Sequence, residues 1–432
     1  MTLLGVALML GRGGTPAERS RARLTVAGTA LATWFLFGAA NVLALRGQLD
    51  DRLGPVSDQG TRPGTALAIA LMVLPVGAFL YQSSRLAASD RDRRLSALRL
   101  AGATPAQVRL LGVLETTRTG VIGATIGAVS YLLLQWASRV LLLPAYLDVS
   151  VPPLFCVAAI ALVIVAATVS GLLVGRHVLA TPLGVTVRAN RRKPHWQALP
   201  LVVPGLVLFH GWAGLSGSGH LAGAALIVVG LLCSQSGLVR LSARVAGRRA
   251  RSAETLLAAR ALEADARPWG RALSVVSLAV ALGSAAGWFE AEAFNENRMT
   301  EAFWLSSFIL VDVALLVTLA VAASALAVHQ AEYLLDHGPV LATLQAVGTP
   351  ETALRRVMSR QALIAATPLC VIASLTGLLT LMRPALPSSW FLWAMPRAFL
   401  VAGLGVLGAV LAAFFSRRRL HRTVAPVRLR TE

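Results

Sequence analysis

The sequence predicts an all-α polytopic membrane protein built from two similar halves. Of its 432 residues, 56% are hydrophobic and only 14% are charged, and the mean hydropathy is +0.68. A soluble domain carries about 25% charged residues, so this composition excludes an ordinary soluble protein. Apolar stretches of membrane-spanning length recur along the chain, and a segment of the first half has a counterpart in the second.

About ten apolar stretches approach or exceed the roughly 20 residues that a helix needs to cross the hydrocarbon core. The fifth is the shortest and contains Pro200 and Pro204, whereas the third is longer than a bilayer requires. The predicted spans are 24–45, 64–84, 110–136, 153–175, 198–214, 221–239, 272–289, 303–328, 361–382 and 394–415.

Basic residues are concentrated between alternate spans. With both termini in the cytoplasm, 32 of the 40 Lys and Arg residues fall in inner segments and seven, including Arg397, fall in outer loops. This asymmetry predicts a multi-pass protein of the cell membrane with both termini cytoplasmic. It also explains the net charge of +20 without nucleic-acid binding. The outer loop predicted at 290–301 is acidic.

The duplicated segment comprises residues 91–127 and 337–377, offset by 246 positions. Each copy predicts a short helix, a glycine turn and a second helix that enters an apolar span. Duplicated modules of the same orientation predict a pseudo-two-fold axis along the membrane normal. The offset pairs Leu95 with Leu341, Leu98 with Leu344, Gly102 with Gly348, and Glu115 with Gln361.

Apolar segments 1–12 and 254–267 precede the first and seventh spans, and both predict amphipathic helices on the inner membrane surface. The layout is therefore four spans, two linking spans and four spans. The predicted boundaries are 1–23 for the N-terminal interfacial helix, 24–176 for the first repeat, 177–250 for the linking segment, 251–416 for the second repeat with its elbow helix, and 417–432 for a basic tail.

The duplicated segment has the features of a rigid elbow. In the first copy leucines lie opposite arginines at helical spacing, Gly102 can adopt the left-handed conformation that ends a helix, and Thr104 is a predicted N-cap. An ordinary basic loop is the alternative, but 337–350 keeps the glycine while losing the basic residues. The predicted coupling residues are Arg91, Arg94, Leu95, Leu98, Arg99, Gly102, Thr104, Leu341, Leu344, Gly348 and Thr349.

Residues 96–108, SALRLAGATPAQV, followed by Glu115 and a glycine-spaced helix, resemble the FtsX-like (MacB-type) permease family of ABC transporters. The resemblance covers 64–176 and 303–416 best, with a degenerate second copy. It implies a ten-span permease subunit, similar to those of peptide-antibiotic resistance systems, whose motion is driven by a separate ATPase.

The chain departs from that family in its outer loops. Resistance permeases usually carry a large outer domain between spans seven and eight, and MacB carries one between its first two spans. Here those gaps are 290–302 and 46–63, too short for a folded domain. Arg94 also replaces an acidic residue that the family often has. A substrate-capturing outer domain is therefore not implied.

The chain lacks an ATPase motif of its own. A P-loop needs the lysine of GK[ST], and the single lysine, Lys193, has no glycine-rich loop before it. The chain is predicted not to be an enzyme and to hold no cofactor, with ATP and Mg on a partner ABC ATPase, in two copies. Membrane lipid is a further expected partner, a second permease or a sensor kinase remains open, and nucleic acid is not expected.

Polar residues within spans are functional candidates by default. Asp312 is the candidate for conformational coupling or proton linkage, with a buried aspartate paired to one helical partner as the alternative. Glu115 and Arg118, three residues apart, predict a structural pair near the first elbow. Asn41 lies in the first span.

Other patterns carry less weight. The GLSG sequence at 214–217 matches the motif of rhomboid proteases, but an outer turn is the favoured interpretation. His329, Glu332 and His337 share a helix face, where a polar surface helix is favoured over a metal site. The GxxxG pair of Gly123 and Gly127 allows close helix packing.

These observations predict a permease subunit that couples ATP hydrolysis by a partner to export of an amphiphilic substrate, such as an antimicrobial peptide or a lipid. One alternative is a membrane relay that signals the state of the ATPase without transport. Another is an ATP-independent secondary transporter, a class that normally shows several intramembrane charges, whereas Asp312 is nearly alone.

Overall fold

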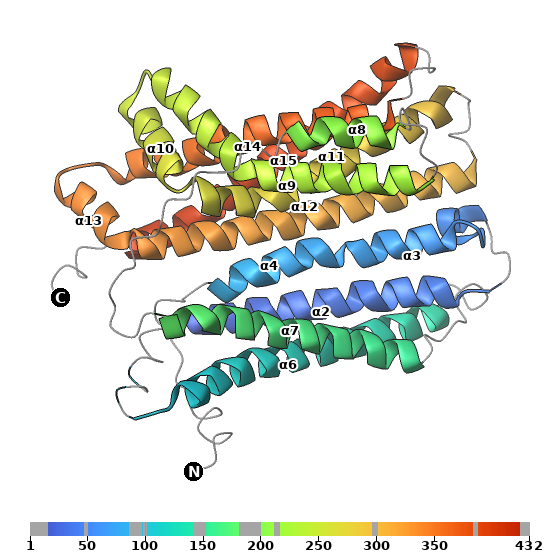
Figure 1. Cartoon of the computed structure of the whole chain (residues 1–432), viewed down its shortest axis with the longest axis horizontal. Helices are drawn as coiled ribbons and strands as arrows, with labels where there is room; N and C mark the ends of the chain where they lie inside the picture. Colours follow the sequence, from blue (N-terminus) through green and yellow to red (C-terminus); the bar gives the residue numbers. More distant parts are fainter. Residues whose placement is uncertain are drawn as a thin grey trace. The chain divides into compact units, whose positions relative to one another are not determined.

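The protein is described by a computed structural model in which every described element is a helix (Figure 1). The helices form two compact units, Met1–Arg191 (unit 1) and Arg192–Glu432 (unit 2). The structure describes residues 16–46, 51–85, 97, 100, 102–141, 153–180, 200–210, 217–295, 301–382 and 388–423. The predicted N-terminal helix at 1–12 lies outside these residues.

Unit 1 is organised around α2, which packs against α3, α4, α6 and α7. Its elements are α2 (Pro16–Ala44), the short helix η1 (Asp51–Val56), α3 (Arg62–Leu71), α4 (Val73–Arg85), α6 (Pro105–Leu141) and α7 (Pro153–Ala180). Two apolar clusters lie along α2, one around Phe37 against α6 and α7, the other around Val42 against α3.

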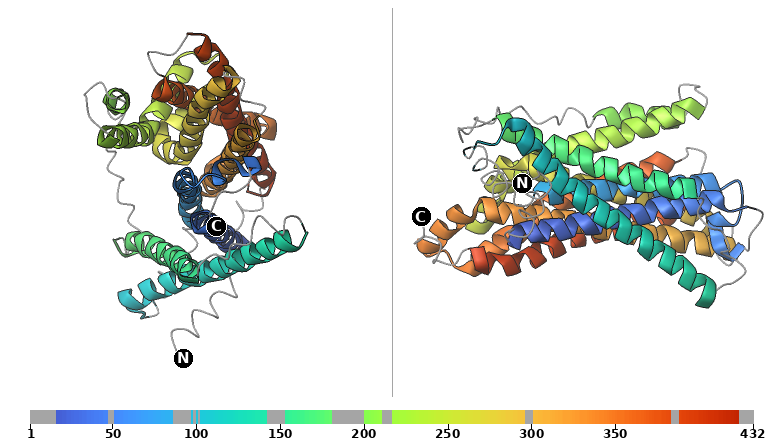
Figure 2. Two further views of the ribbon diagram at one scale, coloured as in Figure 1. Left: turned by 90° about the vertical axis from the view of Figure 1, so that its right-hand side faces the viewer. Right: turned by 90° about the horizontal axis from the view of Figure 1, so that it is seen from below.

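Helix α6 crosses α2 obliquely (Figure 2, right) and approaches it at glycines. A methyl group added to Gly123 would lie 2.5 Å from the carbonyl oxygen of Val26, and one added to Gly127 would lie 2.5 Å from that of Ala30. The close packing predicted from this GxxxG pair is confirmed. Only residues without a side chain let two helix backbones come this near.

Unit 2 is organised around α11, which packs against α9, α12, α14 and α15 and contributes the largest share of the core. Its elements are α8 (Val202–Phe209), α9 (Gly217–Arg248), α10 (Ala253–Ala264), α11 (Ala266–Asn295), α12 (Ala302–Asp336), α13 (Gly338–Ala346), α14 (Glu351–Leu381) and α15 (Ser388–Thr423). The two helices of the predicted linking segment, α8 and α9, belong to this unit. Helix α10, predicted as an elbow helix, packs against α9 and α14.

Seven of the described helices are long and apolar enough to cross a membrane: Glu18–Ala44, Ala106–Ala137, Ala222–Arg248, Ala266–Asn295, Ala302–Leu334, Glu351–Leu381 and Leu392–Phe415. They correspond to seven of the ten predicted spans, and the all-α polytopic prediction is confirmed. The second predicted span is divided between α3 and α4, and the fourth has a shorter apolar helix, Pro153–Val169.

The fifth predicted span is too short as a described helix. Helix α8 has eight residues, a length of about 12 Å, whereas the hydrocarbon core is about 30 Å thick. It packs closely on α9, because a methyl group added to Gly205 would lie 2.9 Å from the backbone nitrogen of Ile227.

Candidate functional site

The second predicted elbow is a helix–turn–helix that joins two long helices of unit 2. Helix α12 ends at Asp336, α13 spans Gly338–Ala346, and α14 begins at Glu351 (Figure 1). Gly348 has φ of 101°, and its N–H donates to the carbonyl of Gln345 at 2.9 Å, while the N–H of Thr349 donates to that of Leu344 at 3.0 Å. This pair of bonds is a Schellman cap, which needs a left-handed residue at the glycine position.

The leucines of α13 attach the elbow to both long helices. Leu341 and Leu344 pack against a cluster of Leu334 from α12 with Leu354 and Met358 from α14. Helix α13 is therefore in direct contact with the ends of both α12 and α14. The opposite side of the elbow is exposed and apolar, since Val347 is 87% exposed.

The first elbow also has a glycine with a positive φ. Gly102 has φ of 96°, as the sequence predicted for a residue that ends a helix in the left-handed region. The hydroxyl of Thr104 accepts from the N–H of Gln107 at 3.3 Å, and the Gln107 side chain accepts from the N–H of Thr104 at 2.9 Å. The predicted N-cap is confirmed and is extended to a capping box. The remaining predicted residues of this elbow, Arg91, Arg94, Leu95, Leu98 and Arg99, lie outside the described residues.

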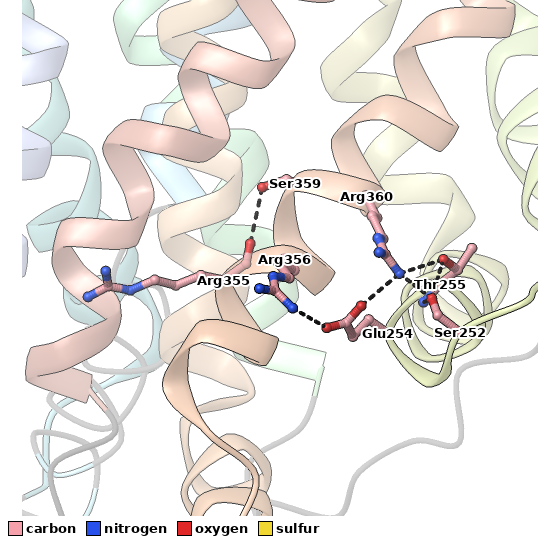
Figure 3. A network of polar contacts seen from close by, with 7 residues as sticks. All are labelled: Ser252, Glu254, Thr255, Arg355, Arg356, Ser359 and Arg360. Carbon is pink, nitrogen blue, oxygen red and sulfur yellow. Dashed lines mark hydrogen bonds and ion pairs between the residues drawn. The ribbon is translucent and has the colours of Figure 1, made fainter.

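A polar clamp that the sequence analysis missed joins α10 to the first turns of α14 (Figure 3). Arg360 donates to the hydroxyl of Ser252 and to the hydroxyl of Thr255, the latter at 2.7 Å. It also lies 2.9 Å from a carboxylate oxygen of Glu254. Arg356 pairs with the same carboxylate at 3.2 Å. Ser252 is also the N-cap of α10, accepting from the N–H of Thr255 at 3.3 Å. The clamp therefore fixes the start of α10 to the helix that leaves the elbow.

The other end of α10 is fixed as well. Arg244 of α9 donates to Glu263 at 2.8 Å, and this guanidinium, assisted by Arg260, lowers the pKa of the Glu263 carboxyl. Asp265, between α10 and α11, lies 3.5 Å from the ring of His337, the residue between α12 and α13. Helix α10 and the residue that follows it are thus tied to α9, to α14 and to the junction between α12 and α13.

Replacement of Arg360 by methionine is expected to loosen the start of α10. The substitution removes the charge-assisted hydrogen bonds to Ser252 and Thr255, but the side chain is about a third exposed, so we expect a local loss of about 1 kcal/mol. Amide hydrogen exchange at residues 253–257 should accelerate by about fivefold. Arg355→Met, which removes only a pair with Glu351 on the same helix, is the control; equal exchange in both variants would contradict the clamp.

Asp312 lies in α12 and pairs with Arg397 of α15 at 2.5 Å. Arg397 also pairs with Glu290 of α11 at 2.7 Å and donates to the carbonyl of Gly283 at 3.2 Å. The prediction that Arg397 lies in an outer loop is wrong, because α15 begins at Ser388 and α11 continues to Asn295, which places Arg397 and Glu290 on helices. Asp312 is 51% exposed, so it is not the buried aspartate of the alternative interpretation.

The polar residues of unit 1 have partners on other helices. The Asn41 side chain donates to the hydroxyl of Tyr131 at 3.1 Å. Glu115 forms an ion pair with Arg21 of α2, which sequence spacing did not indicate. Arg118, one turn further along α6, is exposed.

The weaker motifs do not assemble a catalytic or metal centre among the described residues. No group of three or more His, Cys, Asp or Glu side chains there could hold a metal ion. His329 packs edge-to-face on Trp269, and His337 stacks on Tyr333. Ser216 of the rhomboid-like motif lies outside the described residues.

The seven long apolar helices are those of a multi-pass membrane protein. Residues 66–183 match the family model described as the FtsX-like permease C-terminal domain. The match identifies an FtsX-like permease domain in this region and supports a membrane permease component of an ABC-type system. The match includes the Gly102 elbow with α6 and α7. A search of curated proteins found no match.

Proposed function

We propose that the chain is the permease subunit that couples ATP hydrolysis by a separate ATPase to expulsion of an amphiphilic substrate from the membrane. The observation that carries this proposal is that a glycine with a positive φ precedes a long apolar helix in both units. Gly102 and Gly348 share a positive φ, and each precedes a long apolar helix, α6 or α14. A turn retained while the charges around it change is better explained by mechanical coupling than by topology alone.

The contacts of the second elbow support a lever. Helix α14 has 31 residues, a length of about 46 Å, so a tilt at its first turn displaces its far end. The leucine cluster would pass a push on α13 to α12 and α14 together. The α10 clamp would then carry the same push to α9 and α11, against which α10 also packs.

In this mechanism the chain itself performs no chemistry. ATP and Mg would be held by the partner ATPase, one copy beneath each elbow, at the membrane face that the basic residues predict to be cytoplasmic. The two contacts would be unequal, since the first elbow is basic and the second has apolar residues such as Val340 and Val347 on its surface.

The short connection between α11 and α12 supports a substrate taken from the membrane. Only residues 296–300 separate the described ends of these helices, so no folded domain is inserted there. An amphiphile that partitions into the bilayer needs no such domain to be captured. Export accords with the absence of any feature in the sequence that resembles a docking site for a binding protein.

The test is recovery of an ATPase with the tagged full-length chain from its native membranes in mild detergent. Gly348→Val and Gly102→Val should each reduce that recovery, because a β-branched residue is strained at positive φ. Gly338→Ala is the control, since a methyl group there meets nothing within 4 Å. Purification of the intact wild-type chain without any P-loop ATPase would overturn the proposal.

A further inference from the structure

An arginine-centred ion cluster joins three helices of unit 2 within their apolar spans. Arg397 uses all three guanidinium nitrogens, donating through Nε to Gly283, through Nη1 to Glu290 and through Nη2 to Asp312. The Arg397 side chain is 9% exposed, whereas Glu290 is a third exposed and Asp312 is half exposed. One positive and two negative side chains give the cluster a formal charge of −1.

This excess negative charge lies where it is costly. Asp312 is ten residues into α12, about 15 Å along the helix, inside the apolar span Ala302–Leu334. Electrostatic energies increase as the dielectric constant falls, so a net charge among membrane helices calls for a counter-charge. Arg397 is the one partner of Asp312 among the residues that the structure describes, and its donors are already shared. A cation from outside these helices would complete the balance.

The surface around Asp312 is apolar. Leu305 lies seven residues before Asp312, Ile309 three residues before it and Leu316 four residues after it. These are helical spacings, so the four side chains share one face of α12. The three apolar side chains are each about half exposed. Contact with lipid tails explains the apolar residues but not the half-exposed carboxylate in their midst.

The cluster is not a packing element common to both units. In unit 1, α3, α4 and α7 contain no Asp or Glu, and the single acidic residue of α2 is Glu18, in its first turn. The one acidic residue of α6, Glu115, is paired with Arg21, so the described spans of unit 1 hold no counterpart of the two carboxylates that share Arg397. This contrast favours a role specific to unit 2 over a structural requirement of the fold.

We propose that this face of α12 binds a cationic amphiphile, with an ammonium group on Asp312 and Glu290 and an apolar tail along Leu305, Ile309 and Leu316. Charge complementarity selects a cation, because the guanidinium is already paired with two carboxylates and the cluster keeps an excess negative charge. Transport of this ligand rests on the proposed function; its binding does not.

The experiment uses the full-length chain in nanodiscs, titrated with dodecyltrimethylammonium below its micellar concentration and followed by tryptophan fluorescence. Empty nanodiscs give the partition background, and dodecyl sulfate is the anionic probe with the same tail. Saturable binding of the cation alone is expected, weakened about tenfold or more by Asp312→Asn. Glu301→Gln, a carboxylate of the same helix outside the cluster, should bind as the wild type does.

Equal affinity of wild type and Asp312→Asn, equal weakening by Glu301→Gln, or equally tight binding of dodecyl sulfate would each overturn the inference. If Asp312→Asn does not fold, Ile309→Ser is tested instead. The wild type should bind tetradecyltrimethylammonium more tightly than decyltrimethylammonium, and Ile309→Ser should reduce this difference in affinity. An unchanged difference would contradict the proposal. The chain is assayed without its ATPase. If the cation does not bind, the coupling proposal is therefore unaffected. If no ATPase is recovered with the chain, the proposed ligand site is unaffected.

Discussion

Replacement of Arg397 by methionine is expected to destabilise unit 2 by about 2–3 kcal/mol. Removal of one partner of a buried ion pair typically costs about 3–5 kcal/mol, because the remaining charge is left without compensation. Here the value is discounted, since Asp312 is half exposed and Glu290 a third exposed. The two carboxylates left behind would also repel each other across α11 and α12. Fluorescence-detected thermal unfolding of the purified chain measures the effect.

A triple variant separates charge from packing. Arg397→Met combined with Glu290→Gln and Asp312→Asn removes all three charges, so most of the lost stability should return. Arg397→Lys should fall between wild type and Arg397→Met, because an ammonium group cannot repeat the planar fork that reaches three acceptors. If Arg397→Met is as stable as the wild type, the cluster does not hold the helices together.

The elbows were the most predictable part of the site. A glycine that ends one helix and is followed by an N-cap and a proline has few conformations to choose from, so the turn at Gly102 followed from local chemistry. The packing of Leu341 and Leu344 also agrees with their helical spacing. Local rules act within a few residues and need no knowledge of the tertiary fold.

The polar contacts between helices were not predictable in the same way. Arg360 and Ser252 are 108 residues apart, and Arg397 and Asp312 are 85 apart, so only the fold brings them together. The count of basic residues assigns Arg397 to an outer loop, although the predicted span 394–415 includes it. The paired carboxylates on α11 and α12 allow α15 to include it. The i, i+4 spacing of Arg356 and Arg360 was the one sequence signal of the clamp.

Gly377→Ala is expected to be the most disruptive single-methyl change in unit 2. A methyl group at this position would overlap the carbonyl oxygen of Ala281 and lie 2.9 Å from its carbon. The obstacle is backbone of the central helix α11, which cannot rotate away as a side chain could, so α14 and α11 must separate. Overpacking of this kind costs about 1–3 kcal/mol, and a contact with backbone belongs at the upper end.

Gly403→Ala provides the matched control, because a methyl group on that glycine of α15 meets nothing within 4 Å. Both substitutions add the same methyl group and the same helix propensity, which by itself favours alanine by about 1 kcal/mol. We therefore expect a lower unfolding temperature for Gly377→Ala and an unchanged or higher one for Gly403→Ala. If the two variants unfold alike, α11 and α14 do not pack backbone to backbone at this point. The lever proposed for α14 would then lose its fixed contact with the centre of the unit.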